Sequence, residues 1–532
     1  MYDYDDYDSN YDSPAYPTGD PLLDREFERR GSMKSDGYTD IPEPVSAFLR
    51  RFRDLIADNN PYEISKMYEF SYPKLTEEFY QKTPWPRAEE LTTILGITSD
   101  DIFFILYKEL YFRHIYAVVS SGPTQDQRYE SYCNYCKLFN YFLSSNTPVK
   151  MKLPNQWLWE IVDEFIYQFQ CYQQFRAKAK EEFEVDNHVW EVLQVLNVLH
   201  SMVEKSCINK QLEVFSSGGD PDLAAGEFGR VSLYKNMGYF ALVGLLRLHS
   251  LLGDFYQAIK VLENIDLNQS NLYSRVPGCQ ITTFYYVGFA YMMMRRYADA
   301  IRTFTSILTY INRTKNLFQA KNYQNDQINK QTEKMYTLLS MCLVLHPQRI
   351  DVSLNAVIKE RYGESMSKMQ CGDLSEFESK FAFASPKFLS PLPPSYDKES
   401  NEGHDHMESL KLQSKVFMDE VSQQSMLQTV RSFLQLYTSM PLEKLAEFMN
   451  TTVDDLEQKL LCFKHKMMNV VCKKGNSGLE GEFQSESEVD FFIDLNMIHI
   501  ADTKVDARYG EYFINQIHKF NEMHRNIKSI NI

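Results

Sequence analysis

The stretch Tyr285–Arg302, YYVGFAYMMMRRYADAIR, decides the fold class of this chain. Small residues in and just after it alternate with large ones at the spacing of a tetratricopeptide repeat. These positions are Val287, Gly288, Tyr291, Ala300 and Phe304. The small side chains let two antiparallel helices approach each other, and the large ones fill the seam. The stretch therefore predicts a helical hairpin with its turn near Arg295-Arg296-Tyr297.

A similar unit precedes it, from Tyr239 through Leu262, with a turn at Gly253-Asp254. Ala258 matches Ala300, 42 residues later, which is longer than the repeat of about 34 residues that is usual for this motif. Ordinary helical hairpins are the alternative interpretation. Both interpretations predict stacked helix pairs.

Downstream of this array, the order of elements predicts a winged helix. A helix is expected at 424–437, a second one begins after Met440-Pro441, and a third covers 453–467. A polar loop at 473–488 follows, and two short apolar runs at 489–494 and 497–501 predict a β-hairpin.

We therefore expect a mostly α fold: a helical-repeat (tetratricopeptide-like) array, then a winged helix with a short β-hairpin, then a C-terminal helix. Dense apolar and aromatic patterns upstream predict further long helices, and residues 384–408 are expected to be a linker. The expected ranges are 1–40 for a disordered acidic Tyr/Asp-rich tail, 41–230 for an N-terminal helical domain, 231–420 for the helical-repeat region, 421–505 for the winged helix and 506–532 for the C-terminal helix.

Composition limits the classes of function. The 532 residues carry a formal net charge of −16, and 44% of them are hydrophobic. This balance argues against a dedicated nucleic-acid binder, which usually shows a basic domain or stripe. Nine scattered Cys and an acidic start without an apolar core predict a reduced, cytoplasmic protein without a signal peptide.

No motif predicts catalysis, a cofactor or a metal. Cys133 and Cys136 form a lone C-x-x-C without the second pair that zinc requires. His404 and His406 lie in the polar linker without further ligands. The Gly-rich stretch at 218–229 lacks the Lys-Ser/Thr of a phosphate loop. The expectation is a protein that is not an enzyme.

Cations near the end of the third winged-helix helix could contact RNA. These candidates are Lys464, Lys466, Lys473 and Lys474. Cations also complement the dipole of a helix C-terminus, and the adjoining loop is acidic. We therefore expect the winged helix to bind protein rather than RNA.

The final helix carries an apolar stripe, which predicts a partner interface. Its members are Phe513, Ile517, Phe520, Met523, Ile527 and Ile530. Packing of the stripe against the chain's own winged helix is the alternative.

A helical array that ends in a winged helix resembles the PCI domain, here from about residue 300. The chain is similar to the PCI-domain subunits of eukaryotic translation initiation factor 3. The similar segments include FFILYKELYFRHIYA at 103–117, LPNQWLWEIVDEFIYQFQ at 153–170 and EVDFFIDLNMIHIADTKV at 488–505.

The resemblance implies a scaffold role at the start of translation, in a complex that binds the small ribosomal subunit and recruits mRNA. It implies partners among the other PCI subunits, especially subunits K and E, and no membrane. The alternatives are a direct RNA-binding winged-helix module, or a PCI scaffold of the proteasome lid or the signalosome.

Overall fold

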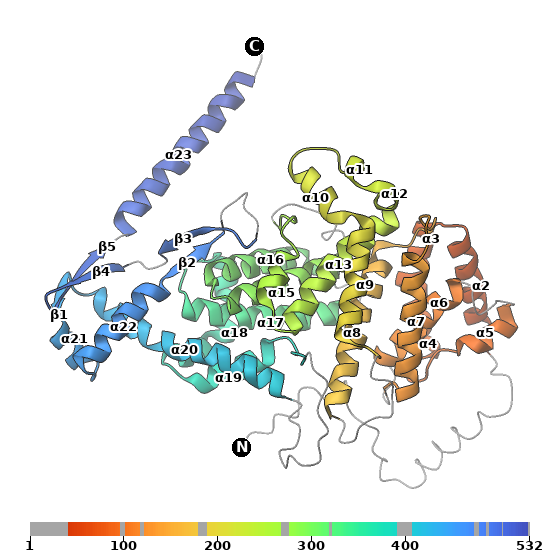
Figure 1. Cartoon of the computed structure of the whole chain (residues 1–532), viewed down its shortest axis with the longest axis horizontal. Helices are drawn as coiled ribbons and strands as arrows, with labels where there is room; N and C mark the ends of the chain where they lie inside the picture. The colour runs from red at the N-terminus through yellow and green to blue at the C-terminus, as the bar shows by residue number, and fades with distance from the viewer. Residues whose placement is uncertain are drawn as a thin grey trace, which may run out of the picture. The chain divides into compact units, whose positions relative to one another are not determined.

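The computed structural model describes residues 41–95, 102–117, 122–178, 189–267, 276–318, 322–390, 407–472, 478–485, 489–502 and 504–529. The chain forms two compact units (Figure 1). The first unit contains residues 1–283 and 387–409, and the second contains 284–386 and 410–532. The division falls within one helix, α15. The domain ranges expected from the sequence stay predictions.

The first unit is helical throughout its described elements. Its helices are α2 (Glu43–Ala57), α3 (Pro61–Lys66), the π-helix η1 (Met67–Ser71), α4 (Tyr72–Phe79), α5 (Ala88–Leu95), α6 (Ile102–Ala117), α7 (Gln125–Leu143), α8 (Asn155–Lys178), α9 (Val192–Ser206), α10 (Ile208–Ser216), α11 (Pro221–Ala224), α12 (Gly226–Gly229), α13 (Ser232–Leu251), α14 (Phe255–Lys260) and the first turns of α15 (Pro277–Met293).

Aromatic packing builds the core of this unit. The fully buried Trp157 ring stacks on Phe52 at 5.5 Å and on Tyr68 at 5.1 Å between ring centroids. A buried ionic group lies beside it, because Arg113 pairs with both Glu109 and Glu160. Trp157 also donates its ring N–H to Glu109 at 3.2 Å. Burial raises the pKa of Glu109, and Arg113 opposes that rise.

The helices of the second unit precede and support the winged helix. They are the rest of α15, then α16 (Tyr297–Phe318), α17 (Asn322–Leu345), α18 (Val352–Gln370), α19 (Leu374–Ala384) and α20 (Glu408–Leu434).

The two predicted helical hairpins are α13–α14 and α15–α16. Gly253 at φ 83° forms the first turn, and Asp254 caps α14 by accepting from the Gln257 N–H at 3.2 Å. In the second hairpin, Gly288 lies against Phe304, which is fully buried.

The mostly α fold with short antiparallel strands near its C-terminal end is confirmed. None of the described helices is long and apolar enough to cross a membrane.

Candidate functional site

The winged helix is formed by two short helices and a three-stranded sheet. The helices are α21 (Leu442–Phe448) and α22 (Val453–Lys466), and the strands are β1 (Ser439–Pro441), β4 (Val489–Asp494) and β5 (Met497–Asp502). The strand order is β1-β5-β4, with both pairs antiparallel. Asn450 at φ 49° forms the turn between the helices, and Thr452 caps α22 through the Asp455 N–H at 3.3 Å.

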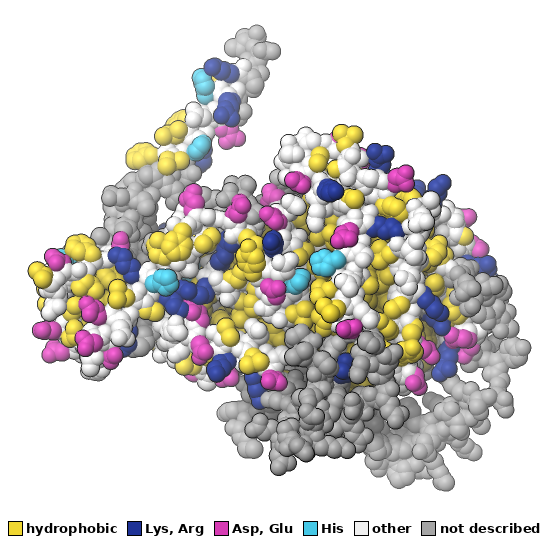
Figure 2. Space-filling view, in the orientation of Figure 1, with side chains coloured by type: hydrophobic (Ala, Val, Ile, Leu, Met, Phe, Trp, Pro, Cys, Tyr) yellow, Lys and Arg dark blue, Asp and Glu magenta, His cyan; other side chains and the backbone are white. Residues whose placement is uncertain are grey.

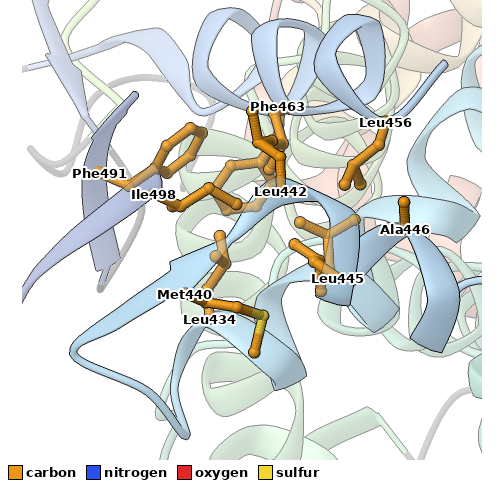
Figure 3. Close-up of a cluster of buried hydrophobic side chains, with 11 residues drawn as sticks. Leu434, Met440, Leu442, Leu445, Ala446, Leu456, Phe463, Phe491 and Ile498 are labelled. Atoms are coloured by element: carbon orange, nitrogen blue, oxygen red, sulfur yellow. The ribbon is translucent and has the colours of Figure 1, made fainter. Parts of the chain in front are cut away.

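One apolar cluster holds these elements together (Figure 3). Phe491 from β4 and Ile498 from β5 point toward Leu442 and Phe463 from the two helices. Each of these four side chains is at most 4% exposed. Since alternate strand residues point to opposite faces, Phe492 and His499 lie on the outer face of the sheet, paired in register and stacked at 5.0 Å.

The polar loop expected at 473–488 is wrong in part, because β3 (Glu482–Ser485) pairs with β2 (Met468–Val471). A Cβ at Gly481 would meet the carbonyl oxygen of Val471 at 2.4 Å. The close approach of the two strands therefore needs a glycine. The polar composition of the loop obscured this strand, since only long-range pairing stabilises it.

The structure brings Lys464 and Lys466 to different intramolecular partners. Lys464 donates to the carbonyl oxygen of Phe491 at 2.8 Å and lies 3.4 Å from the Asp490 carboxylate. Its side chain is 52% exposed. Lys466 pairs with Glu420 of α20, and only 9% of its side chain is exposed. Lys473 and Lys474 lie outside the described residues.

The last helix, α23 (Lys504–Ser529), presents its apolar stripe to solvent. Ile517 is 58%, Phe520 65%, Met523 51% and Ile527 68% exposed, and Phe513 is 59% exposed. Figure 2 shows apolar side chains gathered on this helix, with basic side chains nearer its C-terminal end. Ile514, 55% exposed, borders the stripe and was missed from the sequence pattern. Ile530 lies outside the described residues.

The motifs weighed for metal binding do not assemble a site in the described part of the chain. Groups of three or more His, Cys, Asp or Glu that could hold a metal are absent from these ranges. Cys133 and Cys136 lie on α7, and burial raises the pKa of the Cys136 thiol. His404 and His406 fall outside the described residues, as does the acidic tail.

A helical array followed by a winged helix is the arrangement of the PCI type of helical protein. The sequence profile of the family described as RNA polymerase I-associated factor PAF67 matches residues 127–520.

The chain is also 53% identical to eukaryotic translation initiation factor 3 subunit L of Danio rerio over 562 residues, covering 99% of this chain and 97% of the relative. It is 53% identical to the Homo sapiens protein of the same name over 564 residues, covering 99% of each. The chain therefore belongs to the family of subunit L of eukaryotic translation initiation factor 3.

Proposed function

We propose that this chain is a non-catalytic scaffold subunit of the cytoplasmic eukaryotic translation initiation factor 3 complex. In this role it supports binding of the complex to the small ribosomal subunit and recruitment of mRNA. Membership of the subunit L family over nearly the whole chain supports the proposal. The helical architecture fits a scaffold, because stacked helix pairs offer long surfaces for other proteins.

The partners proposed are the other PCI-domain subunits, especially subunits K and E, and α23 is the proposed docking element. The exposed apolar stripe of α23 is the observation that carries this step. Fully burying one such side chain is worth roughly 1.5–3 kcal/mol. Ile517, Phe520, Met523 and Ile527 together could therefore hold a subunit in place after the costs of ordering.

Co-purification with the other subunits tests this function. We expect deletion of residues 507–532 to abolish co-purification while helical circular dichroism and melting temperature stay nearly unchanged. The double variant Ile517→Asp/Phe520→Asp should do the same without shortening the chain. The matched control, His518→Asp/Arg525→Asp, changes the opposite face of the helix and should co-purify like the natural chain.

Two outcomes would contradict the docking role. If the stripe variant co-purifies as well as the control, α23 is not a docking element. If the deletion unfolds the protein, the stripe belongs to the chain's own core. Loss of binding in both pairs of variants would indicate that the charge of the helix matters, and not its apolar face.

Direct RNA binding by the winged helix is the second candidate, supported by the half-exposed Lys464. Its rank is lower, because the described cations Lys464 and Lys466 already have carboxylate neighbours. Phosphate contacts release counterions, so RNA affinity carried by these cations would fall steeply with salt. If RNA affinity falls steeply with salt and Lys464→Ala reduces that dependence, direct RNA binding becomes the preferred function of the winged helix.

A further inference from the structure

Polar side chains at and around the turn between α15 and α16 contact the β2–β3 hairpin, within the second unit. Arg296 donates through one guanidinium nitrogen to the carbonyl oxygens of Gly478 and Leu479, at 3.0 and 2.9 Å. The Tyr291 hydroxyl donates to the same Gly478 oxygen at 2.8 Å. These contacts hold the chain where it enters β3.

The Asp299 carboxylate holds the other strand of the same hairpin, where the chain leaves β2. It is 3% exposed, and it accepts the backbone N–H of Cys472, at the end of β2, at 3.1 and 3.3 Å. It also accepts from Arg296 Nε at 2.9 Å and lies 3.2 Å from Arg302. Arg302 in turn donates to the Cys472 carbonyl oxygen at 3.0 Å. Both strands of the hairpin are therefore bound to one helical turn.

A second contact joins the same turn to α20 and α22. Glu420 on α20 lies 3.0 Å from Arg295 and also pairs with Lys466 at the end of α22. Gln424 donates to Glu420 at 2.7 Å and lies 3.4 Å from the Tyr297 hydroxyl. Arg295 adopts φ 64°, a left-handed conformation that is uncommon for a residue other than glycine. This conformation ends α15 in a Schellman cap, in which the Arg296 N–H donates to the Tyr291 carbonyl oxygen at 2.9 Å.

We propose that the α15–α16 turn is a clasp that fixes the orientation of the winged helix on the helices before it. Arg296 and Asp299 are its positioning residues toward the β2–β3 hairpin, and Arg295 is its positioning residue toward Glu420. Figure 1 shows β2 and β3 beside α16. The clasp keeps the β2–β3 hairpin on the helical array.

The physical reason is the low exposure of Arg296 and Asp299, at 8% and 3% of their side chains. A buried carboxylate with two cations and an N–H group around it is favourable only while its partners stay in place. Opening the hairpin would strip Arg296 and Asp299 of hydrogen bonds and would expose three backbone carbonyls. The closed clasp is therefore the favoured state of the free chain.

Hydrogen exchange of the full chain, followed by mass spectrometry, tests the clasp. In Asp299→Ala we expect peptides from 468–472 and 478–485 to exchange at least about ten-fold faster, because the hairpin opens locally. Tyr291→Phe removes one hydroxyl donor and should give a smaller, few-fold rise in the same peptides. Glu364→Ala is the control, since it breaks an exposed pair with Lys368 at 2.9 Å on α18.

Orientation is measured separately, with spin labels carried by non-natural amino acids at Val352 on α18 and Glu457 on α22. Val352 is 82% exposed, and Glu457 is also exposed. The distance distribution should broaden in Asp299→Ala and stay narrow in Glu364→Ala. A merely stabilising side chain would change melting without changing this distribution.

The proposal is overturned if hairpin exchange and the label distance in Asp299→Ala equal those of the natural chain. It is also overturned if exchange rises uniformly through α15–α20 while the distance stays narrow. Should Asp299→Ala fail to fold, Tyr291→Phe decides: faster exchange confined to the hairpin supports the clasp, and unchanged exchange refutes it.

Discussion

Substitution of Gly288 by alanine should destabilise the second unit, although alanine favours helices. An added Cβ would lie 2.5, 2.6 and 3.0 Å from three ring carbons of Phe304. The Phe304 ring is fully buried, so it has little room to move away. Overpacking of this kind costs roughly 1–3 kcal/mol, whereas replacing glycine by alanine in a helix gains about 1 kcal/mol. We expect a net loss of up to roughly 2 kcal/mol in the free energy of unfolding.

Gly363 on α18 provides the matched control, because nothing lies within 4 Å of a Cβ built there. Gly363→Ala should stabilise the same unit by up to about 1 kcal/mol. The double variant Gly288→Ala/Phe304→Leu should lose less than the sum of its two single changes, since the smaller side chain removes the overlap.

Urea unfolding followed by circular dichroism measures these changes. The four Trp of the chain, Trp85, Trp157, Trp159 and Trp190, all lie in the first unit. Tryptophan fluorescence therefore reports the first unit, and its midpoint should move less than the circular dichroism midpoint. If Gly288→Ala raises the circular dichroism midpoint as Gly363→Ala does, the packing argument is wrong.

Two further changes address the first unit, and tryptophan fluorescence reports both. Arg113→Met should lower the free energy of unfolding by roughly 3–5 kcal/mol, because it leaves the carboxyl group of Glu109, whose side chain is 0% exposed, buried without its cation. A loss below about 1 kcal/mol would contradict this. Burial lowers the pKa of His114 to about 4. Neutral His114 therefore contributes roughly 3 kcal/mol to the free energy of unfolding above about pH 6.5, and this contribution is lost as the pH falls toward 4. His114→Gln keeps a donor for the Tyr80 carbonyl, 3.0 Å from His114 Nε2, and should flatten the stability curve between those pH values; an unchanged curve would exclude His114 as the cause.

Helices with strong local patterns were predictable from the sequence, because their periodicity is local. α6 at 102–117 is one of the long helices that dense apolar and aromatic patterns predict upstream of the repeat array, and the predicted C-terminal helix is α23. The hairpin turns were also predictable, since Gly253 and Asp254 have the chemistry that such turns need. These features depend on residues a few positions apart.

The short strands were predictable only where apolar residues alternate. The β4–β5 hairpin was found for that reason, whereas β1, β2 and β3, of three, four and four residues, were missed. None of the three carries a periodic signal of its own. Each exists because a partner strand distant in sequence supplies its hydrogen bonds.

The contacts of the clasp could not be predicted from the sequence, because they join residues far apart in the chain. Arg295 and Arg296 could be recognised as a turn, and Asp299 as an ordinary helical neighbour of Arg296. Nothing local reveals that Arg296 contacts Gly478, 182 residues away, or that Asp299 binds the N–H of Cys472. Such contacts follow from the packing of the winged helix on the helical array, and only a structure reveals them.

The packing partner of the α23 stripe could not be predicted from the sequence, because the stripe is equally compatible with two partners. An apolar face that covers the chain's own winged helix and one that binds another subunit have the same periodicity. Exposure favours another subunit as the partner: Phe520 and Ile527 are each about two-thirds exposed. Docking and clasp can be separated by experiment, since removing α23 should abolish partner binding without speeding exchange in the β2–β3 hairpin. Asp299→Ala should release that hairpin while the α23 stripe stays intact. If either change produced both effects, the clasp and the docking helix would act as one element.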